Sequence, residues 1–61
     1  MKYIGYSRIS NILDIKFKYG GGYRYFDVPV GTWEDFFDST SHGTYFNEVI
    51  RNKFSYEKIE P

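Results

Sequence analysis

The most regular pattern in the chain is an alternation of apolar and charged residues over positions 12–19. The odd positions from 13 to 19 are apolar or aromatic, namely Leu13, Ile15, Phe17 and Tyr19. The even positions from 14 to 18 are charged, namely Asp14, Lys16 and Lys18. Because successive side chains of a strand point to opposite faces, this spacing predicts a strand with one buried and one solvated face. The glycines at 20–22 tolerate the positive φ of a tight turn, so residues 23–28 are expected to return as the second strand of a hairpin.

Shorter patterns extend this sheet in both directions. Residues 3–6 have strand character, and Gly5 within them suggests a bulge or the close approach of another backbone. The polar residues 7–11 predict a turn before the alternating strand. Pro29 is expected to end the return strand, because it has no N–H to donate and holds Val28 extended.

Capping residues and helical spacing predict two helices after the proline. Thr32 is the expected N-cap of the first, which ends near residues 39–40 and presents one face made of Trp33, Phe36, Phe37 and Thr40. Ser41 is the expected N-cap of the second, whose apolar positions are Tyr45, Phe46, Val49 and Ile50. Residues 54–59 alternate again and predict a final strand.

These elements predict a small α+β fold, with an antiparallel sheet, the order β-β-β-α-α-β and both helices packed on one face. Residues 1–61 are expected to form a single domain, since the length allows only one. With no cysteine and one histidine, a disulfide is excluded and a structural metal is not expected. Aromatic residues, 23% of the chain, must then fill the core. The expected core residues are Leu13, Ile15, Phe17, Trp33, Phe37, Phe46 and Ile50.

Charge is unevenly distributed although the formal net charge is zero. Residues 1–25 carry five basic side chains and one acidic one, residues 26–48 carry five acidic ones and no basic one, and the rest is net +1. Such a dipolar molecule can steer an anion to one face. It does not favour a strong, non-specific grip on duplex DNA. No apolar run approaches the roughly 20 residues of a membrane helix, which predicts a cytoplasmic protein without membrane contact.

The sequence does not predict an enzyme or a cofactor. Ser41 and His42 are adjacent, and neighbouring side chains at a helix start diverge. Three acidic residues, Glu34, Asp35 and Asp38, fall on a helix surface, where a solvated acidic face is the ordinary interpretation.

Binding is better supported. Tyr23 and Tyr25 share one strand face, with Arg24 opposite and Lys16 and Lys18 on the neighbouring strand, a combination that suits stacked bases and phosphates of single-stranded nucleic acid. The favoured alternative is that both tyrosines pack beneath the helices. The exposed face then holds the basic residues Lys16, Lys18 and Arg24 together with Phe26.

A second candidate site lies at the start of the second helix. Its candidate anion ligands are Ser41, His42, Gly43, Asn47 and Arg51. The structural alternative is that Ser41 only caps the helix, that Gly43 allows a close approach to the first helix, and that Arg51 pairs with Glu48.

Several short motifs, taken in order, resemble the KTSC domain. They are Gly5-Tyr6, Tyr23-x-Tyr25, Val28-Pro29, Ser41-x-Gly43, Tyr45-Phe46-Asn47, Ile50-Arg51 and Tyr56, so the resemblance covers nearly the whole chain. The chain departs from the family pattern at the bulky residues Trp33, Phe36 and Phe37, and at Ser39-Thr40 where alanine is usual.

The KTSC module follows some lysyl-tRNA synthetases and also occurs alone in bacterial and phage proteins, so the resemblance implies a stand-alone module in a bacterial cell. It also implies RNA as the ligand, through the association with a tRNA ligase. Two alternatives stay open: a protein-interaction module, such as a phage regulator of a host protein, and a protein that binds a small nucleotide or anion.

Overall fold

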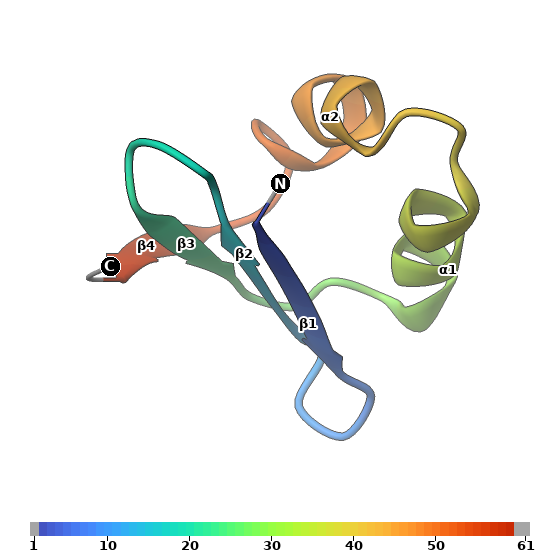
Figure 1. Cartoon of the computed structure of the whole chain (residues 1–61). Helices are drawn as coiled ribbons and strands as arrows, with labels where there is room; N and C mark the ends of the chain where they lie inside the picture. The colour runs from blue at the N-terminus through green and yellow to red at the C-terminus, as the bar shows by residue number, and fades with distance from the viewer. Residues whose placement is uncertain (1, 60–61) are drawn as a thin grey trace.

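The computed structural model describes residues 2–59, which form a four-stranded sheet and two helices (Figure 1). The elements are, in order, β1 (Tyr3–Ser7), β2 (Ile12–Lys16), β3 (Gly22–Tyr25), α1 (Val30–Asp38), α2 (His42–Tyr45), η1 (Phe46–Ile50) and β4 (Tyr56–Ile59). Segment η1 is a π-helical continuation of α2, so the two form one helix. The predicted α+β order and the antiparallel sheet are therefore confirmed.

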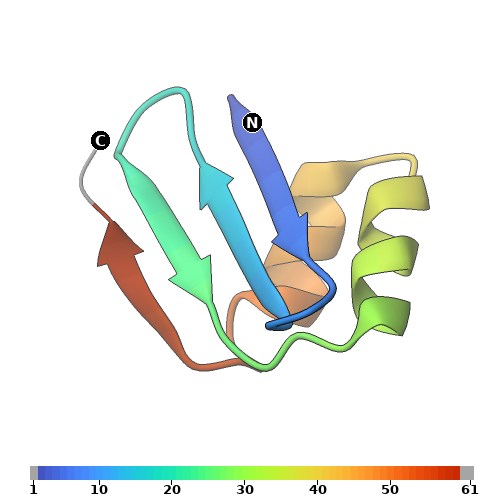
Figure 2. The same ribbon diagram turned by 90° about the horizontal axis from the view of Figure 1, so that it is seen from below.

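The sheet has the strand order β1-β2-β3-β4, and every neighbouring pair is antiparallel. Both helices lie on one face of it, towards β1, as the view in Figure 2 shows. We call this the inner face. Pairing in register places Leu13 opposite Tyr25 and Ile15 opposite Tyr23 on that face, while Asp14 faces Arg24 on the outer face. The alternation in the sequence is thus the alternation between helix-covered and open sides.

The strands around the glycine turn are shorter than predicted. Strand β2 ends at Lys16, and residues 17–21 form a loop closed by a 3.0 Å hydrogen bond from the Phe17 N–H to the Gly21 carbonyl. Positive φ is needed only at Gly20 and Gly21, whereas Gly22 already belongs to β3. Strand β3 ends at Tyr25 rather than at residue 28, because Asp27 adopts a φ of 58° and turns the chain before Val28.

The buried core lies between the sheet and the helices and consists of Leu13, Ile15, Tyr25, Val28, Phe36, Phe46 and Ile50. Phe17 and Trp33, expected within it, are only partly buried and pack against it. The prediction for Phe37 is wrong, because 59% of this residue is exposed while Phe36 is fully buried.

The phase of α1 explains this difference. The helix begins at Val30 with Pro29 as its N-cap, so Thr32 lies inside the first turn, and its assignment as the cap is wrong. The least exposed positions are Thr32, Trp33 and Phe36, which share one helical face. The helix is therefore rotated away from the predicted face, and Phe37 lies at its solvent side.

A small hydrogen-bond network joins the β1–β2 turn to the segment before α1. Tyr6 donates its hydroxyl to the Val28 carbonyl at 2.6 Å and accepts from the Asn11 side-chain amide at 3.0 Å. The Val28 N–H in turn donates to the Asn11 carbonyl at 2.9 Å. Asn11 has a φ of 58°, a conformation that asparagine tolerates better than most residues. The ring of Tyr6 stacks on Trp33 with centroids 5.0 Å apart, so this network also anchors α1.

Two expectations about glycine are wrong. At Gly5 the strand pairs regularly with Asp14, and an added Cβ would meet the Tyr3 side chain rather than another backbone. At Gly43 an added Cβ would meet nothing within 4 Å, so this residue does not bring α2 close to α1. No helix within residues 2–59 is long and apolar enough to cross a membrane.

Candidate functional site

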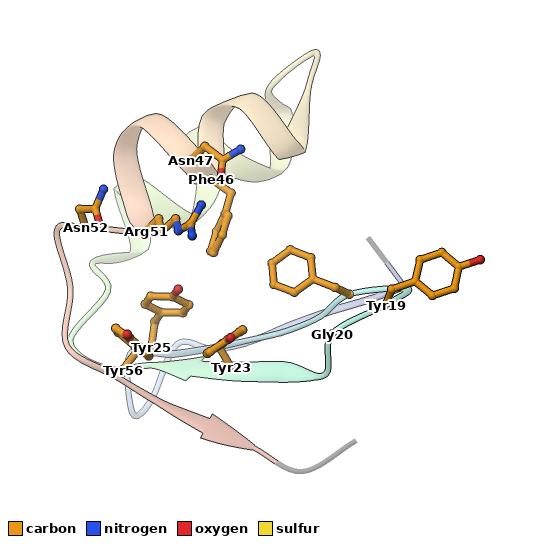
Figure 3. Close-up of a pocket in the computed structure, with 10 residues that line it drawn as sticks. Tyr19, Gly20, Tyr23, Tyr25, Phe46, Asn47, Arg51, Asn52 and Tyr56 are labelled. Carbon is orange, nitrogen blue, oxygen red and sulfur yellow. The ribbon is translucent and has the colours of Figure 1, made fainter.

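A pocket of about 470 Å³ opens between the inner face of the sheet and helix η1 (Figure 3). We call it the aromatic pocket. It is lined by Phe17, Tyr19, Gly20, Tyr23, Tyr25, Phe46, Asn47, Arg51, Asn52 and Tyr56. The volume falls within the range of about 300–1,000 Å³ that is usual for ligand sites.

The floor of the pocket is a set of interlocked rings. Phe46 packs edge-on against Phe17 and Tyr25, with centroids 5.5 Å apart in both pairs. Tyr23 packs edge-on against Phe17 at 6.1 Å and against Tyr56 at 5.6 Å. Edge-to-face pairs of this kind fix the rings relative to one another. The floor is therefore a preformed aromatic surface.

Tyr25 combines a buried ring with a hydroxyl that has no partner among the described residues. The residue is 3% exposed, and no hydrogen bond to its hydroxyl is found within residues 2–59. No polar side-chain atom in these residues is both fully buried and unpaired, so the hydroxyl is reached from the pocket. Burial raises the pKa of Tyr25, with smaller contributions from Tyr56 and Tyr23, while the charge of Arg51 opposes the shift. The phenol stays protonated at neutral pH and can donate.

The polar side of the pocket comes from η1 and the residues directly after it. In η1 the Arg51 N–H donates to the Phe46 carbonyl, five residues back, at 2.8 Å. Such π-helical segments are frequent at functional sites. Asn47 and Arg51, four residues apart, share one side of the helix, and Asn52 follows at its end (Figure 3).

A second hollow, of about 680 Å³, adjoins the pocket at the β2–β3 loop. It carries three lysines and two exposed tyrosines, which we call the hairpin surface: Lys2, Tyr3, Lys16, Lys18 and Tyr19. The Nζ of Lys16 lies 5.9 Å from the Tyr3 ring centroid, and that of Lys18 lies 5.8 Å from the Tyr19 ring centroid. Phe17, Tyr19 and Gly20 line both hollows, so the two meet at the β2–β3 loop.

The structure divides the candidate nucleic-acid residues between two faces of the sheet. Tyr23 and Tyr25 lie on the inner face, as the favoured alternative expects, whereas Lys16 and Arg24 belong to the outer one. Arg24 donates to both carboxylate oxygens of Asp14, at 2.9 and 3.1 Å. This hydrogen bond, and next the charge of Asp14, raises the pKa of Arg24. Arg24 is thus already paired, while Lys16 and Lys18 lie on the hairpin surface.

The candidate anion residues are divided as well. Ser41 caps α2, with its hydroxyl accepting from the Thr44 N–H at 3.3 Å, and the His42 ring Nε2 lies 3.0 Å from the Phe37 carbonyl. Gly43 is exposed and contacts neither hollow. Only Asn47 and Arg51 line the aromatic pocket. No ion pair between Arg51 and Glu48 is found in the described part of the chain.

The structure adds residues that the sequence patterns did not single out as contacts. On the pocket side these are Tyr19, Asn52 and Tyr56, and on the hairpin surface Lys2. Tyr19 directly precedes the glycines of the hairpin turn, and this position was the one feature of the sequence that could have indicated an exposed contact residue. The pocket lining contains no Asp, Glu or His, and no group of three potential metal ligands gathers within residues 2–59. The side chains that line the pocket can stack on a flat ligand and form hydrogen bonds with it.

A sequence model of the KTSC domain matches residues 1–54. The chain belongs to the KTSC domain family. A KTSC domain protein from Yersinia pestis, known from its crystal structure, is 38% identical and superposes with a TM-score of 0.88, covering 92% of this chain and 79% of that one.

KTSC sequences are also found inside longer proteins. The lysine–tRNA ligase of Nostoc punctiforme is 36% identical over 59 residues, which are 97% of this chain and 10% of the ligase. The ligase of Trichormus variabilis is 35% identical over 54 residues, which are 88% of this chain and 10% of the ligase. The chain thus spans about a tenth of the length of these ligases.

Proposed function

We propose that this KTSC domain is a non-catalytic module that binds single-stranded RNA through the hairpin surface and the aromatic pocket. The observation that carries the proposal is their shared boundary: exposed lysines and tyrosines adjoin, at the β2–β3 loop, a pocket floored by aromatic rings. Lysines neutralise backbone phosphates, and each base stacked on an aromatic ring contributes about 1–3 kcal/mol.

Single strands suit this surface better than a duplex. Unpaired bases can be splayed out and stacked on aromatic side chains, whereas the bases of a duplex are already stacked on one another. Tyr3 and Tyr19 are 52% and 82% exposed, which leaves their rings available. RNA rather than DNA is proposed because the relatives from Nostoc and Trichormus are named as ligases that act on a tRNA. Such a role places the protein in the bacterial cytoplasm.

A salt titration of a fluorescent 12-nucleotide RNA tests the proposal. Affinity is expected to fall with salt at a slope of about −0.7 per neutralised phosphate in a plot of log K against log salt. The double variant Lys16→Ala/Lys18→Ala should make this slope shallower by up to about 1.4. Lys53→Ala is the matched control, since Lys53 lines neither hollow.

Two results would overturn the proposal. One is an absence of binding at about 50 mM salt, where electrostatic contacts are strong. The other is a double variant whose affinity and slope equal those of the unaltered protein.

A protein-interaction role is the second candidate, and apolar side chains on the surface favour it. Ile9 is 98% exposed at the tip of the β1–β2 turn, and Phe37 is exposed on α1. A host protein bound through these residues would be lost in an Ile9→Ser/Phe37→Ser variant that still binds the RNA probe normally. Co-purification from bacterial cells with the unaltered protein and with this variant, followed by mass spectrometry, identifies a partner that only the unaltered protein retains.

A further inference from the structure

We infer that the aromatic pocket receives one unpaired guanine base, whose edge is read by Arg51. This inference rests on the proposed function and deepens it, since it names the base that a bound strand inserts. The hairpin surface would hold the phosphates on either side, and the pocket would supply the sequence preference.

The first argument is the unpartnered hydroxyl of Tyr25. This side chain is almost fully buried, yet its hydroxyl makes no hydrogen bond within residues 2–59 and is accessible at the pocket. The hydroxyl is therefore free to donate to, or accept from, a bound group without first breaking a bond to the protein. The pocket therefore fits a ligand that offers a hydrogen-bonding atom at the depth of the aromatic floor.

The second argument is the shape and polarity of the walls. The floor and one side are aromatic, and the other side is the polar edge formed by Asn47, Arg51 and Asn52 (Figure 3). A nucleobase has the same two-sided character, with a flat face that stacks and an edge that hydrogen-bonds. An alkyl chain would leave the polar edge unpaired, and a bare phosphate would leave the rings unused.

The third argument concerns which base is preferred. Arg51 is the only charged residue in the lining, and its guanidinium presents donors in a planar fork. Guanine offers such a fork two adjacent acceptors, O6 and N7, on the edge that arginine reads most often in specific base contacts. An unpaired cytosine offers its own adjacent pair, O2 and N3, so the comparison of G with C is the decisive one. Asn47 and Asn52 can complete the remaining edge with amide donors and acceptors.

The position of the pocket explains how a strand would deliver the base. The lysines of the hairpin surface lie beyond Tyr19 and Gly20, which line both hollows. A strand whose phosphates follow these lysines therefore passes the pocket entrance. Free GMP carries the same base, so a free nucleotide is the other source that the experiment must separate.

Four nine-nucleotide RNAs test the inference, each made of uridines with G, A, C or U at the central position and a fluorescein at one end. The G probe is expected to bind about 5- to 150-fold more tightly than the others, the range that one bidentate contact provides. Arg51→Lys, which keeps the charge and removes the fork, should abolish this preference, so that the G probe binds no more tightly than the all-U probe. Arg8→Lys is the matched control outside the pocket, and circular dichroism verifies that the variants are folded.

The outcomes separate this inference from the proposed function. Equal binding of all four probes, a preference for another base, or a guanine preference that survives Arg51→Lys would overturn the inference and leave RNA binding intact. Saturable binding of GMP, weakened by Arg51→Lys in a protein that binds no RNA, would support the guanine pocket with a free nucleotide as its source and overturn the proposed function. If neither the probes nor GMP bind, both fail.

Discussion

The ring of Tyr25 belongs to the core, and its hydroxyl belongs to the pocket. On one side the ring packs against Phe46, and on the other the hydroxyl remains without a protein partner within residues 2–59. Removing the hydroxyl therefore costs the fold little, in contrast to removing the ring. This separation allows the two roles of one residue to be measured independently.

The raised pKa of Tyr25 predicts a loss of stability at alkaline pH. Above pH 10 the unfolded chain releases the phenolic proton before the folded chain does, so the free energy of unfolding falls as pH rises towards the higher native pKa. Below pH 10 both states keep the proton, and the contribution is constant. Tyr25→Phe should remove this part of the decline. Urea unfolding of both proteins between about pH 8 and pH 11 measures it, and parallel declines would contradict the prediction.

Tyr6 differs from Tyr25 because its hydroxyl is fully used. Tyr6→Phe keeps the ring stacked on Trp33 but removes the bonds to Val28 and Asn11. Leaving these partly buried partners unpaired is expected to cost about 1–3 kcal/mol in the free energy of unfolding. Tyr19→Phe, at a highly exposed tyrosine, should cost nothing measurable in the same urea titration. Equal stability of the two variants would show that the network between the turn and α1 does not stabilise the fold.

At the scale of elements, the sequence predicts the presence and type of the helices better than their orientation. The alternation at residues 12–16 has only two possible phases, and the structure confirms Leu13 and Ile15 as core. A helix can be rotated about its axis by a small angle, and the spacing of its apolar residues does not distinguish between orientations that differ this little. In α1, the cap at Pro29 and the stacking of Trp33 on Tyr6 select the phase that buries Phe36.

This difference gives a direct test with two neighbouring residues of the same kind. Phe36→Ala should lower the free energy of unfolding by about 3–5 kcal/mol, as expected for a large core residue. Phe37→Ala should cost less than about 1.5 kcal/mol, because it loses only its contacts with the rings of Trp33 and His42. Thermal and urea unfolding compare the pair, and Phe36→Leu provides a milder variant if Phe36→Ala does not fold. If Phe37→Ala lowered the free energy of unfolding more than Phe36→Ala, the helix orientation predicted from the sequence, with Phe37 in the core, would be correct.

The π-helical turn of η1 illustrates a second limit of the sequence patterns. Residues 45–50 predict an α-helix by their apolar spacing, and nothing in them marks the extra residue in the turn. Asn47 and Arg51 share the side of the helix that lines the pocket, together with Asn52, whereas Ser41 caps the start of the helix outside it. The candidate anion ligands are therefore divided between the pocket and the cap.

At the scale of the whole molecule, the aromatic pocket combines residues from two candidate sites that are separate in the sequence. Tyr23 and Tyr25 come from the first, and Asn47 and Arg51 from the second. They meet because β3 runs beneath η1, a proximity that depends on topology rather than on spacing along the chain. Residue types were therefore predictable from the sequence, but their grouping was not.

Basic and acidic side chains gather at opposite sides of the molecule. The lysines of the hairpin surface lie at the β2–β3 loop, while Glu34, Asp35 and Asp38 lie on α1, which both views place at the far side of the molecule (Figures 1 and 2). On the outer face of the sheet, Asp14 neutralises Arg24. The dipolar arrangement expected from the sequence is thus present between the hairpin and α1, and a field of this kind steers anions towards the side that carries the lysines.

Strand β4 completes one wall of the pocket, and it is synthesised after the other segments that line it. It pairs only with β3, as the edge of the sheet, and contributes Tyr56 to the lining. During synthesis, residues 2–21 leave the ribosome before β4 does, so the lysines of the hairpin surface precede part of the pocket wall. The pocket is complete only after β4 has docked. The proposed reading of a base therefore requires β4, whereas the proposed phosphate contacts do not.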